Sequence, residues 1–247
     1  MSASLAAMPG HEFATTRWSL VRQAAQADTA DGRTALAGLC ERYWPPLYAF
    51  ARRLGHSASD AEDLTQGFFA HLLDTDFLRR ADVGRGRFRN YLLSSFQNFV
   101  ANEWHRDRAA KRGGGLLVSL DYESEERRVV ELMDRLTPEA VFERRWAMTV
   151  LERALATIGD QWMSSGRGEV FARLKPLLIG EADDAYRDLT AALGMTEGAL
   201  RTAAHRLRRQ FAHTLREQIL ETVSGVDEVD DEIRYLLNIL AQAPPAT

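Results

Sequence analysis

Apolar residues recur at helical spacing along almost the whole chain, and this periodicity constrains the fold more than any other feature. Between residues 36 and 54 the large apolar side chains are three or four positions apart: Leu36, Leu39, Tyr43, Leu47, Phe50 and Leu54. A repeat near 3.6 residues is typical of an amphipathic α-helix. Residues 116–120 form the only candidate strand, so the sequence predicts an all-α protein.

Proline, glycine and capping residues indicate where the helices of the first half begin and end. Pro45 and Pro46 predict a kink or a break, because proline lacks the amide hydrogen that a helix interior uses. Gly55 is expected to end this helix. Ser59 and Glu62 have the spacing of a capping box and predict the start of a second helix.

The composition excludes several classes of protein. The 247 residues are 45% hydrophobic and 27% charged, which is enough to fill the cores of one or two domains of about 100–200 residues each. Cys40 is the only cysteine, which excludes an internal disulfide and a zinc site with several thiolate ligands. No apolar run approaches the roughly 18 residues of a membrane helix, and no signal peptide is visible. We therefore expect a cytoplasmic protein without a membrane contact.

Charge is divided into blocks of alternating sign, although the net charge is only -4. Residues 54–78 contain five acids and no Lys or Arg, whereas residues 79–112 contain nine basic residues and three acids. Residues 201–216 contain five Arg and no acid, and residues 221–232 contain six acids and no base. This distribution predicts a surface that binds a polyanion and a second, acidic surface that docks on a partner.

The same signals divide the chain into five parts. We expect an N-terminal arm (1–14), a helical domain (15–112), a flexible linker (113–137), a second helical domain (138–223) and an acidic helical extension (224–247). The linker begins with a run of glycines and ends at Thr137, which is followed by proline and glutamate and is therefore a strong helix start.

Residues 185–209 contain the most specific local pattern, two helices separated by a tight turn. The first is expected to end at Gly194, and Thr196 is placed to cap the second. The DNA major groove admits one helix, and arginine can bind guanine through paired hydrogen bonds, so the pattern predicts a DNA-binding helix-turn-helix. We expect its second helix to supply base contacts and phosphate contacts, the former from Arg201, Thr202, His205 and Arg206 and the latter from Arg208 and Arg209.

The second and third helices carry opposite charge. Asp60, Glu62 and Asp63 lie in one first turn, and three acids exceed what capping requires, so we expect them to dock on a cationic partner. No second acid cluster or histidine pair accompanies them, and we expect no catalytic residue, metal or cofactor. The third helix, over residues 88–111, carries Asn98 and Asn102 on one face, and amides can bond to base edges. Most of its aromatic rings are expected in the core.

These motifs resemble the extracytoplasmic-function sigma factors of bacterial RNA polymerase over nearly the whole chain. Residues 60–66, with the sequence DAEDLTQ, are similar to the acidic helix with which such factors bind the clamp helices of the polymerase β′ subunit. The resemblance implies two helical domains, contacts with the β′ and β subunits and with promoter DNA, and no enzymatic activity. It assigns core-polymerase binding to Asp60, Glu62, Asp63, Leu64 and Gln66.

The resemblance also implies which residues read the promoter. Residues 88–112 look like the helix that recognises the −10 element, which implies contacts from Arg87, Phe88, Asn98, Asn102 and Arg106. Residues 198–206 look like the −35 recognition helix, with Arg201, Thr202, His205 and Arg206 at base-reading positions.

Two regulatory hypotheses accompany the resemblance. Some relatives without an obvious membrane anti-sigma partner are associated with Ser/Thr kinases, so a kinase or an anti-sigma factor is a candidate partner. Thr65, inside the acidic helix, is then a candidate phosphosite, because a phosphate adds a charge of about -1.5 to -2. The acidic extension could instead mask the arginine-rich recognition helix in the free protein.

Two other functions are compatible with the residues. A stand-alone helix-turn-helix repressor would bind duplex DNA without polymerase, usually as a dimer with half-sites about one turn apart. A nucleic-acid enzyme would use Asp60, Glu62 and Asp63 with magnesium. Promoter-specific initiation with core polymerase separates the sigma interpretation from both.

Overall fold

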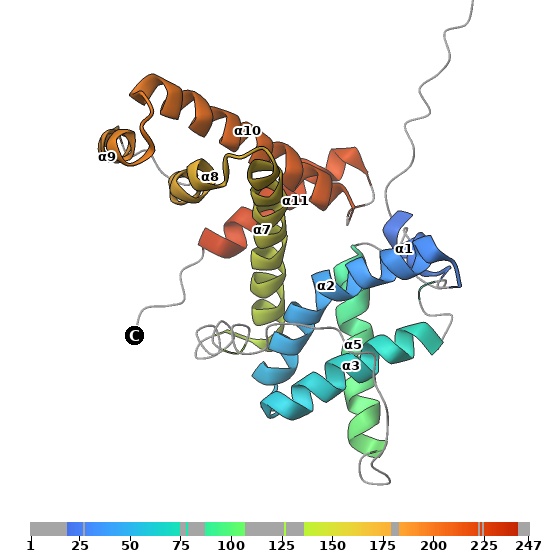
Figure 1. Ribbon diagram of the computed structural model, residues 1–247. Helices are drawn as coiled ribbons and strands as arrows, with labels where there is room; N and C mark the ends of the chain where they lie inside the picture. The colour runs from blue at the N-terminus through green and yellow to red at the C-terminus, as the bar shows by residue number, and fades with distance from the viewer. Residues whose placement is uncertain are drawn as a thin grey trace, which may run out of the picture.

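A computed structural model describes most of the chain, namely residues 19–26, 28–74, 78, 87–106, 126, 136–178, 183–221, 223 and 225–241. The described residues form helices and turns with no β-strand among them, which confirms the all-α prediction (Figure 1). The expected arm, the candidate strand at 116–120 and most of the expected linker lie outside the described residues.

The helices follow the sequence periodicity closely. Their bounds are α1 Ser19–Ala24, α2 Ala30–Arg53, α3 Ala58–Asp74, α5 Phe88–Arg106, α7 Pro138–Ser164, α8 Gly168–Leu174, α9 Asp183–Leu193, α10 Glu197–Leu220 and α11 Val229–Ala241. Two short 3-10 turns, Lys175–Leu177 and Val226–Glu228, follow α8 and precede α11. None of the described helices is both long enough and apolar enough to cross a membrane.

Helix α2 is continuous through Pro45 and Pro46, so the break predicted there does not occur. Both prolines are buried, and the rings of Trp44 and Tyr48 stack beside them with their centroids 4.8 Å apart. Burial of the surrounding side chains therefore offsets the hydrogen bonds that the prolines cannot donate.

The predicted helix ends are confirmed where glycine or threonine sets them. Gly55 follows α2 with a φ of +97°, and the amide of His56 donates to the carbonyl of Ala51 at 3.3 Å, the pattern of a Schellman cap. Thr137 caps α7 by accepting a hydrogen bond from the amide of Ala140 at 3.2 Å. These caps fix where the helices leave the core.

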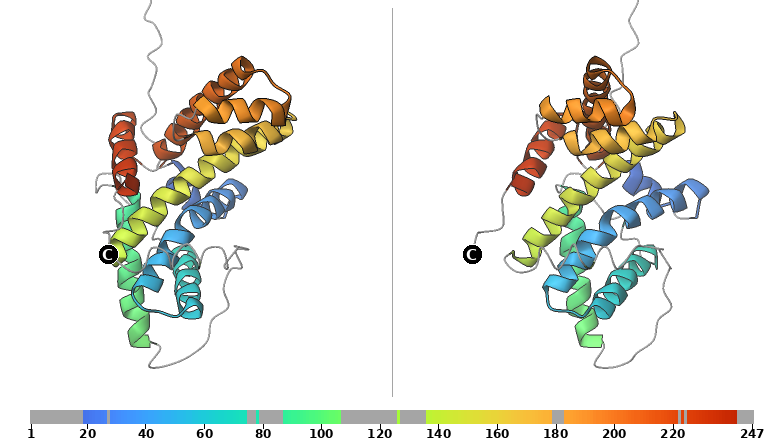
Figure 2. Two further views of the ribbon diagram at one scale, coloured as in Figure 1. Left: turned by 90° about the vertical axis from the view of Figure 1, so that its left-hand side faces the viewer. Right: turned by 60° about the vertical axis from the view of Figure 1, so that its left-hand side comes forward.

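One hydrophobic cluster joins the two halves of the chain. It combines α2, α3 and α5 with the first part of α7, the last turns of α10 and α11, and its buried side chains include Trp44, Phe68, Phe96, Trp146 and Leu236. Helix α7 packs along α2, as both figures of the whole chain show (Figure 1, Figure 2). The expected separation into two domains at the linker is therefore not a separation between two cores.

Ion pairs fasten the second half of the chain to α2. The guanidinium of Arg42, only 3% exposed, lies 2.6 Å from the carboxylate of Glu221 at the end of α10. Arg153 of α7 pairs with Glu41 of α2 at 3.1 Å, and the pair is solvent-accessible. The Arg42–Glu221 pair therefore holds the end of α10 against α2. The Arg153–Glu41 pair contributes little to the contact between α7 and α2, because an exposed ion pair is weak in water.

A second cluster forms around the turn between α9 and α10. Ile158 and Trp162, near the end of α7, meet Leu200 and Leu207 of α10 there. Gly194 has a φ of +62° at the turn, and Thr196 accepts a hydrogen bond from the amide of Ala199 at 3.3 Å. The two helices thus form where the sequence predicts them, and α7 contributes side chains to both clusters. Figure 2 shows α7 running between α8 and α10 at one end and α2 and α5 at the other.

The junction of α1 and α2 predicts opposite effects for two glycines of the same helix. A Cβ on Gly32 would lie 1.9 Å from the carbonyl oxygen of Gln26, whereas a Cβ on Gly38 would meet nothing within 4 Å. Gly32→Ala should lower the free energy of unfolding by about 1–3 kcal/mol, because the turn before α2 must shift. Gly38→Ala should raise it by about 0.5–1 kcal/mol, because alanine is the better helix former. Urea unfolding followed by circular dichroism measures both, and equal effects would contradict the described junction.

Candidate functional site

The three acids predicted to share the first turn of a helix are divided between the first two turns of α3: because α3 begins at Ala58, its first turn contains Asp60, and Glu62 and Asp63 follow. The cap of α3 is Ser57 rather than Ser59: the Ser57 hydroxyl oxygen accepts from the amide of Asp60 at 3.1 Å and donates to the Asp60 carboxylate at 2.7 Å. The cap residue therefore lies two positions earlier than expected. Asp60 is exposed and has a structural role in capping α3.

The other candidate docking residues are spread around the exposed side of α3. The carboxylate of Glu62 accepts a hydrogen bond from the side-chain amide of Gln66 at 3.0 Å, one turn later. Asp63 is exposed, and Leu64 is half-buried against the first cluster. Asp63 is therefore presented to solvent and Glu62 is half-buried, on a helix whose other face is anchored in the core.

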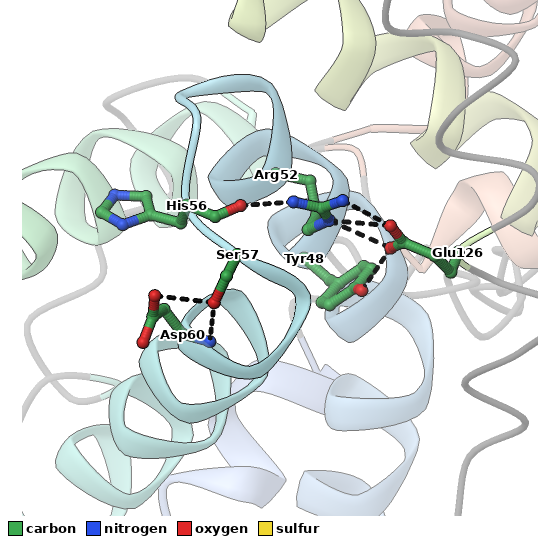
Figure 3. Close-up of polar contacts among 6 residues, drawn as sticks. All are labelled: Tyr48, Arg52, His56, Ser57, Asp60 and Glu126. Carbon is green, nitrogen blue, oxygen red and sulfur yellow. Dashed lines mark hydrogen bonds and ion pairs between the residues drawn. The ribbon is translucent and has the colours of Figure 1, made fainter.

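An arginine at the end of α2 holds the loop that leads into α3 (Figure 3). The guanidinium of Arg52 donates to the backbone carbonyl of His56 and to both carboxylate oxygens of Glu126, with its Nε at 3.0 and 3.1 Å from the latter. The hydroxyl of Tyr48 donates to the same carboxylate at 2.5 Å. Glu126, a residue of the expected linker, is thereby attached to the last turns of α2 through the same arginine that holds this loop.

The Glu126 contacts shift two pKa values in opposite directions. Hydrogen bonds from the Arg52 guanidinium hold the pKa of the Glu126 carboxyl below its usual range. Burial and the adjacent Glu126 carboxylate raise the pKa of the Tyr48 hydroxyl. The contact of Glu126 with Arg52 and Tyr48, here called the Glu126 anchor, is therefore an ion pair with a neutral phenol at neutral pH. Its hydrogen bonds are stronger when the carboxylate is ionised.

Thr65, the candidate phosphosite, faces the core. Its side chain is fully buried, and its hydroxyl donates to the carbonyl of Ala61 at 2.7 Å. A kinase would reach this hydroxyl only after α3 moved away from the helices it packs against. Phosphorylation of Thr65 stays a prediction, and it requires a conformation other than the one described.

Helix α5 presents some of its predicted DNA-binding residues and buries others. Asn98 and Asn102 are both exposed, one turn apart, as expected for a shared face. Phe88, in contrast, is 2% exposed and its ring packs edge-on against Tyr43 with 5.5 Å between centroids. The expectation that Phe88 contacts DNA is therefore corrected: it is a core residue. The side chain of Arg106 lies outside the described residues.

Arg87 and Arg89, at the start of α5, are engaged by the C-terminal helix. Nε of Arg87 lies 2.9 Å from one oxygen of Glu232, and Arg89 donates to its other oxygen. Arg89 also donates to Glu143 of α7 at 2.8 Å. Sequence reasoning missed this cluster. Its signal is a charged residue within an apolar stripe: Glu232 is three and four residues from the buried Val229 and Leu236.

Helix α10 exposes most of the predicted recognition residues. Thr202, His205, Arg206 and Arg209 are exposed at spacings of three and four, and therefore share one face. Arg201 is also exposed, pairs with Glu197 at 2.8 Å and lies over the ring of Tyr186. These residues form a basic surface, here called the α10 face, composed of Arg201, Thr202, His205, Arg206 and Arg209.

Arg208 differs from its neighbours. It is half-buried, and its guanidinium donates to the carbonyl of Leu177 at 3.0 Å and to the hydroxyl of Tyr186 at 3.3 Å. It joins α10 to α9 and to the segment after α8. A phosphate contact by Arg208 stays a prediction, but its position in the structure is that of a brace.

The described part of the acidic extension, residues 225–241, pairs with arginines outside the α10 face. Asp230 of α11 pairs with Arg216, near the end of α10, whereas Glu232 pairs with Arg87 and Arg89. The hypothesis that the extension masks the recognition helix is therefore wrong for the described conformation, because α11 packs against α7 and the far end of α10.

Within the described parts of the chain, no three His, Cys, Asp or Glu side chains are grouped so that they could hold a metal ion. The carboxylates of Asp60 and Glu62 instead accept hydrogen bonds from their own helix and its cap.

Comparison with known proteins gives one match to a family model, over a segment that includes the candidate docking residues of α3 and the candidate DNA-binding residues of α5. Residues 39–110 match Sigma-70 region 2, a stretch that runs from the middle of α2 past the end of α5. The match supports a sigma-70 family factor, with a role in promoter recognition and RNA polymerase binding. The comparisons with curated proteins and with solved structures gave no match.

The anchor at Glu126 predicts a stability contribution that depends on pH. Because its pKa is lowered in the folded protein, its contribution is present above the ordinary carboxyl pKa and is lost as the pH falls through the lowered value. Glu126→Gln should lower the free energy of unfolding at neutral pH by about 1–3 kcal/mol, and the difference from wild type should shrink in acid. Glu217→Gln, at an exposed pair with His213, is the matched control and should have no measurable effect. Urea unfolding across pH measures this; a constant difference would contradict the ionised anchor.

Proposed function

We propose that this protein is an extracytoplasmic-function sigma factor that binds core RNA polymerase and directs initiation at promoters with a −35 and a −10 element. The observation that carries the proposal is the Sigma-70 region 2 match, which includes the helix that presents Asp60 and Asp63 to solvent. A protein of this class performs no chemistry itself. It acts by holding polymerase at a promoter and by helping to open the −10 segment.

The proposed polymerase contact uses the first two turns of α3. Exposed carboxylates on a rigid helix attract and orient a cationic surface, here the clamp helices of the β′ subunit. Asp60, Glu62, Asp63, Leu64 and Gln66 are the proposed core-binding residues. Rigidity supports this role, because α3 is tied to α2 through Arg52 and its loop and needs little ordering on binding.

The proposed promoter contacts lie on two helices. The α10 face would enter the major groove at the −35 element, with Arg201, Thr202, His205 and Arg206 near base edges and Arg209 near phosphate. Asn98 and Asn102 of α5 would contact the −10 strand, and Arg87 would bind phosphate. The exposure of both asparagines and of the α10 face supports this arrangement.

The proposal is tested by transcription with purified core polymerase. The template is sheared genomic DNA of the source organism, and transcripts are mapped by their 5′ ends. A sigma factor should give a set of start sites that share two upstream elements and that core polymerase alone does not give. A stand-alone repressor with the same helix pair would bind duplex DNA without polymerase and would give no new start sites.

Charge reversal on α3 tests the polymerase contact. Asp63→Arg should weaken binding to core polymerase at least tenfold, because an exposed docking carboxylate becomes a like charge facing a cationic partner. Glu169→Arg is the matched control: it also reverses an exposed acid in a first helical turn, that of α8. Fluorescence anisotropy with labelled protein measures both affinities. Equal loss in the two variants would point to a general charge effect and would exclude α3 as the docking site.

Removal of one arginine from the α10 face tests the −35 contact. Arg206→Ala should weaken binding of the protein–polymerase complex to its promoter by about 1–3 kcal/mol and should relax sequence preference at one −35 position. Arg33→Ala removes an exposed arginine of α2 and should leave both properties unchanged. Quantitative selection from a randomised −35 library is the measurement. Unchanged preference in Arg206→Ala would contradict base reading by this residue.

A further inference from the structure

The C-terminal helix α11 contacts the start of α5 through the fully buried carboxylate of Glu232. Glu232 has no exposed surface, although it follows two acids that are largely exposed. Its two oxygens face two different arginines: Nε of Arg87 lies 2.9 Å from one, and the guanidinium of Arg89 donates to the other. A carboxylate is buried only where positive charge compensates it, so this contact is specific rather than incidental.

The ring of Tyr235 completes the contact. It lies against both guanidinium groups, 5.1 Å from Arg87 and 4.8 Å from Arg89, one turn after Glu232 on the same helix. Arg89 also contacts the indole ring of Trp146, with 4.4 Å between its guanidinium carbon and the ring centroid. Helix α11 therefore covers these arginines with both a carboxylate and an aromatic face, the two groups that bind guanidinium best.

Contacts at both ends hold α11 in place. Val229 and Leu236 are buried in the first cluster, and the carboxylate of Asp230 accepts from Arg216 at the end of α10. Arg144 of α7 donates to the carbonyl of Ile239 at 3.2 Å. The helix is thus docked along its length against α7 and α10 and is not an independent tail.

We propose that α11 is an autoinhibitory clamp: its Glu232 and Tyr235 occupy Arg87, the arginine that the promoter strand would bind, and promoter binding requires α11 to leave it. This inference rests on the proposed function, in which the start of α5 contacts −10 DNA. Nε of Arg87 is directed at Glu232, and a phosphate bound by the remaining donors of this guanidinium would lie close to the Glu232 charge, so phosphate binding favours the release of α11. Arg89 is only 3% exposed and is also held by Glu143 and Trp146 of α7, so it fixes the docked position of α11 and is not itself a proposed DNA contact.

The clamp predicts that weakening α11 increases DNA binding by the free protein. Its apparent affinity for DNA is reduced by the fraction of molecules in which α11 is displaced, and a substitution that raises this fraction raises the affinity by the same factor. Glu232→Gln keeps the size of the side chain but removes the charge that Arg87 and Arg89 compensate. Tyr235→Leu removes the aromatic face while preserving the apolar contact.

The experiment measures binding of the full chain to a single-stranded −10 oligonucleotide taken from a promoter mapped with core polymerase. Glu232→Gln and Tyr235→Leu should each bind at least threefold more tightly than wild type. Asp231→Asn is the matched control, because it neutralises the adjacent acid, which is exposed and pairs only along its own helix with Arg234. Asp231→Asn should bind like wild type. Equal gains in all three variants would show a general charge effect and would overturn the clamp.

A second measurement needs no variant and protects the test against a variant that fails to fold. Hydrogen exchange of the wild-type protein, alone and in the complex with core polymerase and promoter DNA, reports the opening of α11 directly. Amides of residues 229–241 should lose protection in the complex, whereas those of α7 should not. Unchanged protection of α11 would overturn the clamp even if the variants were unstable.

The two proposals fail in different ways. If wild-type protein gives no promoter-specific transcripts with core polymerase, the sigma-factor proposal fails. If wild type initiates at mapped promoters, but the clamp variants gain no DNA affinity and α11 stays protected in the complex, only the clamp fails.

Discussion

Burial of the Arg89 guanidinium is the constraint on which the packing of this protein depends. Arginine keeps its charge at any accessible pH, and at 3% exposure the charge must be compensated by protein groups. Glu143 and Glu232 supply two carboxylates, and Trp146 supplies a ring face. Because these partners come from α7 and α11, the ion pairs favour the described arrangement of the three helices. Removing one partner of a buried ion pair typically costs about 3–5 kcal/mol.

Most helices could be predicted from the sequence because their signals are local. Gly55, Gly194, Thr137 and Thr196 set helix ends through their own backbone conformation or their own side chain, and the structure places them as expected. The helix through Pro45 was harder, because burial of neighbouring side chains outweighs the loss of a hydrogen bond, and burial depends on partners far along the chain. The cap of α3 lies two residues before the predicted one because Ser57 and Asp60 have the same sequence spacing as Ser59 and Glu62, and the structure uses the first pair.

The candidate surfaces were also predicted only in part, because burial and pairing depend on residues far along the chain. Exposure of Asp63 and Arg206 follows from their positions opposite the apolar stripes of α3 and α10. Spacing alone could not show that Phe88 packs on Tyr43. The pair of Arg89 and Glu232 joins residues 143 positions apart, and no local pattern specifies such a partner. A charge inside an apolar stripe is nevertheless visible in each helix, and two such charges of opposite sign are a usable signal for a buried ion pair.

Helix α7 contributes side chains to both hydrophobic clusters, Trp146 to one and Trp162 to the other. A single rod therefore sets the spacing between the helix pair at one end of the protein and α5 at the other. Its rise of about 1.5 Å per residue cannot stretch, unlike a flexible tether. In the conformation described, α7 holds the α9–α10 helix pair at a fixed distance from α5. A change in that distance requires α7 to separate from α2 rather than a linker to extend.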